Sequence, residues 1–278
     1  MTPRDLIRRT SEVFRSAGIP DPENDASLLL SFLTGRPPLS LRLDTEPLSD
    51  PSVLAEYQSL ADRRLRRVPL QYLLEEAPFC GRMFKVDQRV LIPRPETAQL
   101  TEWALDLLKD RPCPRVLDLC CGSGCIGLTI KAERPDASVT LSDLSADALN
   151  VTALNAVSLS LDVTIRKSDL LEELADASFD LIVSNPPYIP TSECDRLQPE
   201  VMQEPRLALD GGPDGCDLYR RIIRASGSVL VSGGKLLMEC GIHESGILSD
   251  LLSDRGYRDI EIRTDFAGID RMILAVWP

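Results

Sequence analysis

The sequence contains a single histidine, His243, and no cysteine pair spaced as Cys-x-x-Cys. Because a structural zinc site needs four closely spaced cysteine or histidine ligands, no zinc cluster is expected. The chain is long and opens without an apolar signal segment, so its eight cysteines are expected to be reduced thiols, packed as small apolar side chains. These features predict a cytoplasmic protein without a bound metal.

Long apolar runs are also absent. No stretch reaches the roughly 20 apolar residues of a membrane-spanning helix, so no such helix is expected. The net charge of −12 lies in the second part of the chain, since residues 1–92 are neutral overall and residues 93–278 carry 18 basic and 30 acidic side chains. Such a surface repels phosphate backbones, which makes a long nucleic-acid duplex a poor default partner.

The first part of the chain has apolar residues at helical spacing over 4–17, 22–34 and 51–67. Glycine and proline between the first two stretches end one helix and start the next. The pattern predicts a small all-helical domain over residues 1–74. Within it, the run Arg-Arg-Leu-Arg-Arg at 63–67 is interpreted as a solvated helix face.

A change of pattern marks a second domain. Residues 75–96 alternate short β-prone pieces with turn residues and predict a β-hairpin linker. Residues 97–278 then alternate strand and helix, which predicts an α/β domain with an open, mostly parallel sheet and helices on both faces. The last two strands are joined by the short link Phe-Ala-Gly-Ile-Asp, so they are expected to form an antiparallel pair at the sheet edge.

The expected elements of this α/β domain can be placed from the sequence. The strand candidates are 115–119, 138–143, 162–169, 179–185, 233–240, 259–265 and 271–278. The helix candidates are 97–109, 125–134, 145–158, 215–231 and 244–254.

A glycine-rich turn follows the first strand of this domain, in the stretch VLDLCCGSGCIGL. Asp118 ends the strand, and Gly122 and Gly124 allow the backbone to pass close to a ligand. Cys125 begins a helix whose amino end favours a carboxylate or phosphate. The stretch lacks the G-x-x-x-x-G-K-[ST] pattern of a phosphate loop, so nucleotide hydrolysis is not expected.

A second polar residue ends the next strand. Asp143 lies 25 residues after Asp118, where a carboxylate accepts hydrogen bonds from ribose hydroxyls, and Ser145 can cap the following helix. Asp143 could instead be only a turn residue, but the glycine-rich turn before it favours ligand binding.

The strand 179–185 breaks off at Asn185-Pro186-Pro187-Tyr188. The Asn185 side-chain oxygen and the Pro186 carbonyl can both accept hydrogen bonds from an NH₂ group, and proline makes the corner rigid. Tyr188 offers an aromatic face on which a planar amide can stack. Beside a nucleoside site, this corner predicts methyl transfer from S-adenosylmethionine to a planar amino or amide nitrogen, without a strong base or a metal.

This corner, behind the turn DLCCGSG, resembles the amino-methyltransferases with a Rossmann-like fold. Three further stretches narrow the resemblance to the HemK/PrmC family: IPRPET at 92–97, EPRLALDGGPDGCDLYRRII at 204–223 and GGKLLMECG at 233–241. The resemblance covers nearly the whole chain. It implies methylation of the glutamine side-chain amide in the Gly-Gly-Gln motif of peptide-chain release factors, with the helical domain recognising the protein substrate.

The resemblance also implies roles for individual residues. The catalytic set is Asn185, Pro186 and Tyr188, and the substrate-binding set adds Pro187. The cofactor-binding set is Asp118, Cys120, Cys121, Gly122, Ser123, Gly124, Asp143, Leu170, Asn185, Arg94 and Thr97. Glu239 and Arg271 match family positions too, although a buried ion pair or a sheet-edge contact explains them equally well.

The sequence departs from the family pattern at two places. Cys120 and Cys121 stand where the turn usually has glycine and threonine, which changes how closely the backbone approaches the methionine end of the cofactor. Leu170 stands where relatives often carry tryptophan against the adenine, so stacking there becomes a weaker apolar contact.

Two other functions remain open on the sequence alone. An N6-adenine methyltransferase acting on nucleic acid could use the same Asn-Pro-Pro-Tyr corner, but it needs a basic groove or a target-recognition insert, and neither is visible after residue 190. A non-catalytic adapter that binds the cofactor or a ribosomal partner has no need of the acceptor corner.

Overall fold

The computed structural model describes residues 1–278, which form two compact units. The first unit comprises Met1–Glu76 and Gln198–Gln203, and the second comprises Ala77–Leu197 and Glu204–Pro278. The short segment Gln198–Gln203 packs with the helical unit. The sequence pattern did not predict this packing. None of the helices combines the length and the apolar character needed to span a membrane.

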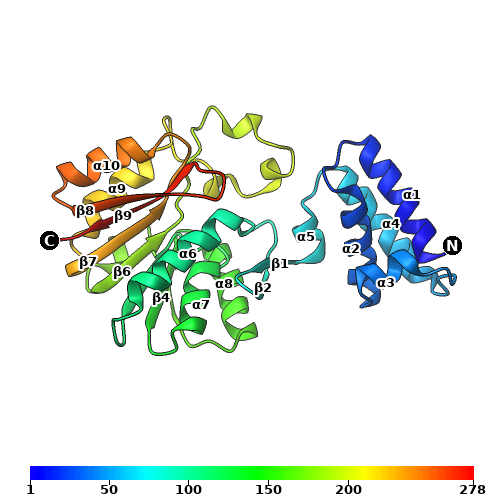
Figure 1. Cartoon of the computed structure of the whole chain (residues 1–278), viewed down its shortest axis with the longest axis horizontal. Helices are drawn as coiled ribbons and strands as arrows, with labels where there is room; N and C mark the ends of the chain where they lie inside the picture. The colour runs from blue at the N-terminus through cyan, green and yellow to red at the C-terminus, as the bar shows by residue number, and fades with distance from the viewer. The chain divides into compact units, whose positions relative to one another are not determined.

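The first unit is all helical (Figure 1). Its helices are α1 (Pro3–Ser16), α2 (Pro22–Thr34), α3 (Pro38–Leu43), α4 (Pro51–Leu65) and α5 (Leu70–Leu74). The first four begin with proline, whose fixed φ suits a first helical turn and whose missing N–H would be unpaired there anyway. Phe14, Leu29, Leu30 and Tyr57 are fully buried and form the centre of the core.

A buried ion network lies inside this unit. Arg64 donates to Asp25 at 2.8 Å and to Glu200 at 2.9 Å, and its side chain is only 5% exposed. Arg67 pairs with Glu200 at 3.0 Å and donates to the carbonyl of Gly18. Two arginines of the run at 63–67 are therefore structural, and the interpretation of that run as a solvated face is wrong for them.

A hairpin of β1 (Glu76–Phe79) and β2 (Arg82–Lys85) follows the helices, and from Ala77 onward it belongs to the second unit. Phe79 and Phe84 meet edge to face with ring centroids 6.0 Å apart and join the core of this unit. Asn155 accepts from the Lys85 backbone N–H at 2.7 Å and donates to the Lys85 carbonyl at 3.1 Å. These contacts fix the hairpin on the α/β core.

The sheet of the second unit has seven strands in the order β5-β4-β3-β6-β7-β9-β8. The strands are β3 (Arg115–Leu119), β4 (Ser138–Asp143), β5 (Thr164–Lys167), β6 (Phe179–Ser184), β7 (Leu230–Glu239), β8 (Arg258–Thr264) and β9 (Asp270–Val276). Pairing is parallel from β5 to β7 and antiparallel for β7–β9 and β8–β9. The predicted α/β class and the antiparallel pair at the edge are confirmed.

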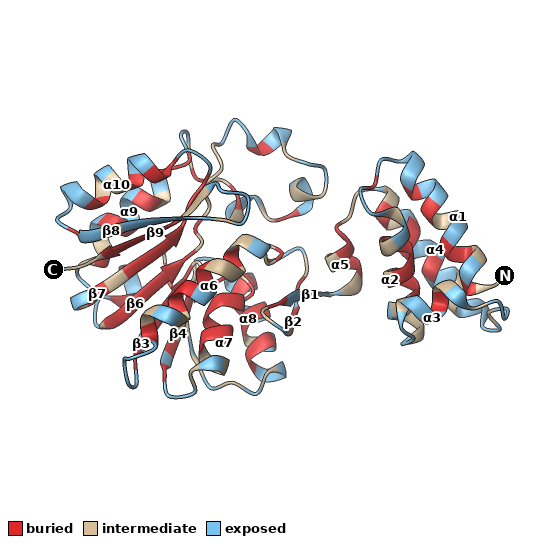
Figure 2. Cartoon of the chain, in the orientation of Figure 1, coloured by how far each residue is buried: buried red, intermediate tan, exposed pale blue.

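Helices cover both faces of the sheet (Figure 1). They are α6 (Pro95–Leu108), α7 (Cys125–Glu133), α8 (Ala146–Ser158), α9 (Asp217–Ser226) and α10 (Ser245–Asp254). One core cluster joins the sheet to α6, α7 and α8, and a second joins it to α9 and α10. All six residues of β6 are buried, as expected for a central parallel strand covered on both faces (Figure 2).

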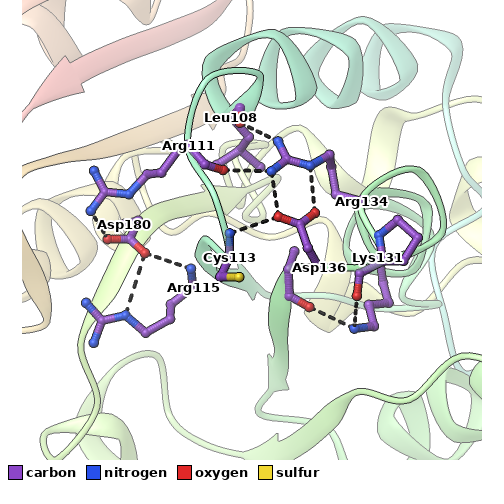
Figure 3. A network of polar contacts seen from close by, with 10 residues as sticks. Leu108, Arg111, Cys113, Arg115, Lys131, Arg134, Asp136 and Asp180 are labelled. Carbon is purple, nitrogen blue, oxygen red and sulfur yellow. Dashed lines mark hydrogen bonds and ion pairs between the residues drawn. The ribbon is translucent and has the colours of Figure 1, made fainter.

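Ion pairs tie the amino-end edge of the sheet together (Figure 3). Asp180 at the start of β6 accepts from the Arg111 side chain and, at 2.7 Å, from the Arg115 backbone N–H at the start of β3. Arg134, just past α7, pairs with Asp136 and donates to the Arg111 carbonyl. These contacts link β3, β6 and the turn after α7 at the amino ends of the strands.

The chain reverses its direction of travel across the sheet at β3. It passes from β3 to β4 and β5 on one side, then returns to place β6 and β7 on the other. The carboxyl ends of β3 and β6 lie side by side, with Leu119 opposite Ser184. Such a reversal leaves a crevice between the loops that follow the two strands, where open α/β sheets bind their ligands.

Candidate active site

An open cleft occupies this position and encloses about 1110 Å³ of space, including solvent at its mouth. It is lined by the turn after β3, the ends of β4 and β5, Asn185 and Pro187 after β6, and residues from the segments 89–94 and 205–208. The cleft therefore lies over the carboxyl ends of the neighbouring strands β5, β4, β3 and β6, where open α/β sheets bind their ligands.

The glycine-rich turn is shaped by two glycines in the left-handed region, Gly122 at φ 55° and Gly124 at φ 80°. A Cβ on Gly124 would stand 2.9 Å from the Thr152 methyl group, so this position requires glycine for space as well as for conformation. Gly122 faces open space, and its N–H donates to Asp143 at 2.9 Å. The turn is thereby held against the end of β4.

Two residues that line the cleft have a left-handed backbone without being glycine. Cys120 has φ 61° and occupies the place where the resemblance expects glycine, and Leu170 has φ 53°. The Ser168 hydroxyl donates to the Leu170 carbonyl at 2.6 Å and holds that turn. Conformations of this kind cost about 1–3 kcal/mol each and persist where the surrounding structure imposes them, most often at functional sites.

Asp143 lies at the end of β4 and is part of the cleft lining. One oxygen accepts from Gly122 N–H and the other from Ser145 N–H, both at 2.9 Å. Burial raises the pKa of Asp143, and these two N–H bonds oppose the shift. Because each carboxylate oxygen retains another acceptor position, Asp143 can still receive two hydroxyls, as a ribose requires.

Asp118 is fully buried beneath the turn and does not line the cleft. One oxygen accepts from Gly127 N–H at 2.7 Å and so ties β3 to α7, whereas the other has no hydrogen-bond partner. Burial raises the pKa of Asp118 to about 7. The position fits bracing of the turn rather than direct contact with a ligand.

The predicted cofactor residues divide accordingly. The cleft lining includes Cys120, Cys121, Gly122, Ser123, Asp143, Leu170, Asn185, Arg94 and Thr97. Asp118, beneath the turn, and Gly124, within it, are not part of the lining.

The acceptor corner divides in the same way. Asn185 and Pro187 line the cleft, while Pro186 and Tyr188 do not. The Asn185 amide donates from Nδ2 to Thr97 Oγ1 at 3.1 Å, and Thr97 in turn donates to Glu239 Oε2 at 2.7 Å. Asn185 is therefore held by a residue of α6 and, through it, by the end of β7.

The Tyr188 hydroxyl contacts the same buried carboxylate. It accepts from Arg271 Nη2 at 2.8 Å and donates to Glu239 Oε1 at 3.3 Å, and the Arg271 guanidinium lies 5.3 Å from the centre of the tyrosine ring. Arg271 also pairs with Glu239 at 3.3 Å. The ring predicted as a stacking surface is thus fixed by a buried ion pair outside the cleft lining.

Sequence reasoning missed two groups that shape the cleft. Asp169 lines it just past the end of β5 and pairs with Arg221 at 2.8 Å. Asp169 has the same signal as Asp143, a carboxylate at a strand end, and the same rule finds it. Glu204 accepts from Ile92 N–H at 3.0 Å and pairs with Arg94, so it joins two wall segments 110 residues apart, which no local pattern reveals.

The chain is similar over nearly its full length to curated release factor glutamine methyltransferases. The relative from Clostridium acetobutylicum is 39% identical, with 91% of this chain and 90% of the relative covered. The relative from Deinococcus radiodurans is also 39% identical, with 98% of this chain and 97% of the relative covered. This chain belongs to the release factor glutamine methyltransferase family.

Two family models match separate parts of the chain. The PrmC N-terminal domain matches residues 5–74, and the Methyltransferase small domain matches residues 99–212. The resemblance to the HemK/PrmC family and the enzyme class inferred from it are confirmed.

Solved structures show how widely the fold is shared. A methyltransferase from Pyrococcus furiosus aligns with a TM-score of 0.55 at 15% identity, covering 78% of this chain and 98% of that protein. A Thermus thermophilus 16S rRNA methyltransferase, solved with AdoMet and guanosine, aligns with a TM-score of 0.53 at 17% identity, covering 73% of this chain and 50% of that protein. At these identities the likeness concerns the fold alone.

Proposed function

We propose that this chain transfers the methyl group of S-adenosylmethionine to the side-chain amide nitrogen of the glutamine in the Gly-Gly-Gln motif of peptide-chain release factors. The observation that carries the proposal is the position of Asn185, whose amide lines the same cleft as Asp143 and is held there by Thr97. Family membership supplies the protein substrate, because the curated relatives are named for it. The place of action is the cytoplasm, where release factors work.

The residues present fit S-adenosylmethionine. Asp143 offers acceptor positions to the ribose hydroxyls, and the buried Ser142 hydroxyl in the cleft lining has no partner within the protein. Leu144 and Leu170 provide apolar contacts for the base. When bound, the cofactor supplies a methyl group made electrophilic by its sulfonium.

Asn185 and the Pro186 carbonyl act on the acceptor amide. Its nitrogen is a poor nucleophile because the lone pair is delocalised into the carbonyl, so it must be positioned in line with the methyl group. As the C–N bond forms and the C–S bond breaks, the bonding pair stays on sulfur and the nitrogen becomes positive. Both acceptors stabilise that charge until one of the two nitrogen-bound protons passes to water.

Tyr188 has a supporting part in this proposal. Its hydroxyl is held by Arg271 and Glu239, so the ring braces the corner that carries Asn185. No direct nucleic-acid partner is proposed, since the acidic balance of residues 93–278 opposes binding of phosphate backbones.

The test offers labelled S-adenosylmethionine together with a release factor, a release factor in which the Gly-Gly-Gln glutamine is changed to alanine, or an oligonucleotide. We expect label only in the unchanged release factor. Label in the oligonucleotide would instead support an adenine methyltransferase, and cofactor binding without transfer to any of the three would support an adapter.

Asn185→Ala provides the matching variant. Loss of one preorganised acceptor should lower kcat by roughly 10²–10³-fold and change KM less. Wild-type rates in Asn185→Ala, with the fold and cofactor affinity verified, would show that the corner is only structural.

A further inference from the structure

The orientation of the Asn185 amide is a separate question from its position. An asparagine amide has an acceptor oxygen at one end and a donor NH₂ at the other, and the two ends have nearly the same shape. Only the oxygen can receive a hydrogen bond from the NH₂ group of an acceptor glutamine. If Nδ2 faced the cleft, two donors would be brought together.

The residues behind Asn185 settle which end faces inward. Glu239 is fully buried at the end of β7, and an ionised carboxylate can only accept hydrogen bonds. Thr97 has one hydroxyl proton and directs it to Glu239 Oε2 at 2.7 Å. The Thr97 oxygen therefore has only acceptor capacity left for Asn185.

Asn185 must therefore donate a hydrogen bond to the Thr97 hydroxyl oxygen. Its Nδ2 lies 3.1 Å from Thr97 Oγ1, which is the pairing that this order of donors and acceptors requires. The Asn185 oxygen is then left for the cleft, which Asn185 lines. This order of donors and acceptors, from Asn185 through Thr97 to Glu239, follows from the negative charge on Glu239 and from the single proton of the Thr97 hydroxyl.

The buried charge on Glu239 has its own support. Arg271 pairs with Glu239 at 3.3 Å, and the Tyr188 hydroxyl donates to it at the same distance. Burial raises the pKa of Glu239, and the Thr97 and Tyr188 hydroxyls together with the Arg271 charge oppose that shift. These partners favour the ionised carboxylate, the form that can only accept hydrogen bonds. Arg271 and Tyr188 thus contribute indirectly to the orientation of Asn185.

We propose that Thr97 and Glu239 are positioning residues that hold the Asn185 amide with its oxygen toward the acceptor nitrogen. This inference rests on the proposed function and adds to it. It gives the PRPET segment, which contains Thr97, a defined part in recognising an NH₂ donor.

The first test replaces the Thr97 hydroxyl. Thr97→Val keeps the shape but releases the amide to rotate, and we expect kcat on the release factor to fall about tenfold with cofactor affinity within about threefold of wild type. Thr97→Ser keeps the hydroxyl and should restore kcat to within about twofold. Thr101→Val is the control for loss of a buried threonine hydroxyl on α6, because Thr101 donates to the Thr97 backbone carbonyl and has no hydrogen bond to the Thr97 side chain or to Asn185.

A double variant separates positioning from a general effect on structure. In an Asn185→Ala background the amide is gone, so Thr97→Val should lower kcat further by no more than about twofold. If Thr97 only stabilises the fold or the cofactor site, the tenfold loss should reappear in full.

A readout without catalysis completes the test. In ¹⁵N-labelled protein, the Asn185 side-chain NH₂ signals are assigned by their absence in Asn185→Ala. The proton bonded to Thr97 should be protected from solvent exchange in wild type, Thr97→Ser and Thr101→Val. Protection should be lost in Thr97→Val. Unchanged protection and unchanged kcat in Thr97→Val would overturn the inference. A wild-type protein that fails to methylate the glutamine would instead overturn the proposed function, and the exchange measurement alone would then test the inference.

Discussion

At the scale of single residues, we propose that Asp143 performs two tasks with one carboxylate. It holds the glycine-rich turn through Gly122 N–H and the start of α8 through Ser145 N–H, and it keeps acceptor positions for the ribose. A residue that shapes the site and also binds the ligand should be sensitive to any change of side chain.

We expect Asp143→Ala to weaken S-adenosylmethionine binding by about 1.5–3 kcal/mol, because a charged acceptor is lost. Isothermal titration calorimetry measures this directly, with thermal unfolding to verify the fold. Asp162→Ala is the matched control, since it removes the same charge from an exposed position just before β5. Equal cofactor affinity in the two variants would exclude Asp143 as the ribose ligand.

Asp118 should give the protein a characteristic pH dependence. Its pKa is about 7 in the folded protein against 3.8 for the unperturbed group, so between these values the folded state holds a proton that the unfolded state has lost. The free energy of unfolding contributed by this group is therefore highest below about pH 4, falls as pH rises to about 7, and is level above that.

Asp118→Asn isolates this contribution, because asparagine can still accept from Gly127 N–H and does not titrate. We expect the difference in urea-unfolding free energy, variant minus wild type, to increase between about pH 4 and pH 7. Glu244, whose pKa burial also raises to about 7, is present in both proteins and cancels in the difference. A difference that is independent of pH would mean that Asp118 stays ionised when folded.

Residues at strand ends could be found from the sequence, but their partners could not. Asp143 and Asn185 follow recognisable strands, and both line the cleft. The contact between Thr97 and Glu239 spans 142 residues and depends on how α6 packs beside β7, which local periodicity does not contain. The left-handed backbone of Cys120 was also beyond prediction, because cysteine rarely adopts that conformation.

At the scale of elements, apolar strands and helices of several turns were predictable, and the shortest helices were not. The predicted helix 22–34 coincides with α2, and the predicted strands 115–119 and 138–143 coincide with β3 and β4. The helix α3 has six residues and α5 has five, too few to display an amphipathic period. Tertiary packing rather than local pattern determines such elements.

The wall of the cleft depends on one buried carboxylate that joins two elements. Glu204 is 5% exposed, accepts from Ile92 N–H and pairs with Arg94, directly before α6. We expect Glu204→Ala to lower the free energy of unfolding by about 2–3 kcal/mol, since it leaves a buried N–H without an acceptor and a cation without a partner. Glu204→Gln keeps an acceptor for Ile92 and should lose less. Urea denaturation provides the measurement.

Asp195→Ala serves as the control for Glu204. Asp195 lies in the same connection after β6 and pairs with Arg206, but both side chains are more than half exposed, so its loss should cost at most about 1 kcal/mol. If Glu204→Ala and Asp195→Ala unfold alike, the carboxylate of Glu204 does not stabilise the wall.

At the scale of the whole molecule, the segment Gln198–Gln203 has the least foreseeable position. It follows the acceptor corner in sequence, yet it packs with the helical unit, where Glu200 meets Arg64 and Arg67. The chain thus passes between the two units at residues 76–77, 197–198 and 203–204 rather than once. Sequence periodicity predicted the two kinds of unit but contains no signal for these additional crossings.

Deleting residues 1–74 tests what the helical unit contributes to the reaction. The cleft lining belongs to the second unit, so cofactor affinity should stay within about threefold of the full chain. An intact release factor offers a much larger surface than one glutamine, and loss of the helical unit should raise its KM by roughly tenfold or more, while KM for a short Gly-Gly-Gln peptide should change little.

The deletion also removes Arg64 and Arg67, so its effect must be separated from the loss of their ion pairs with Glu200. Full-length Glu200→Ala loses the same pairs and keeps the helices, which makes it the matched control. If the helices themselves recognise the release factor, KM should rise for the shortened chain and much less for Glu200→Ala. If both proteins show the same increase in KM, loss of the Glu200 ion pairs that fix the segment Gln198–Gln203 is responsible. If KM rises in neither protein, the helical unit has no part in recognising the substrate.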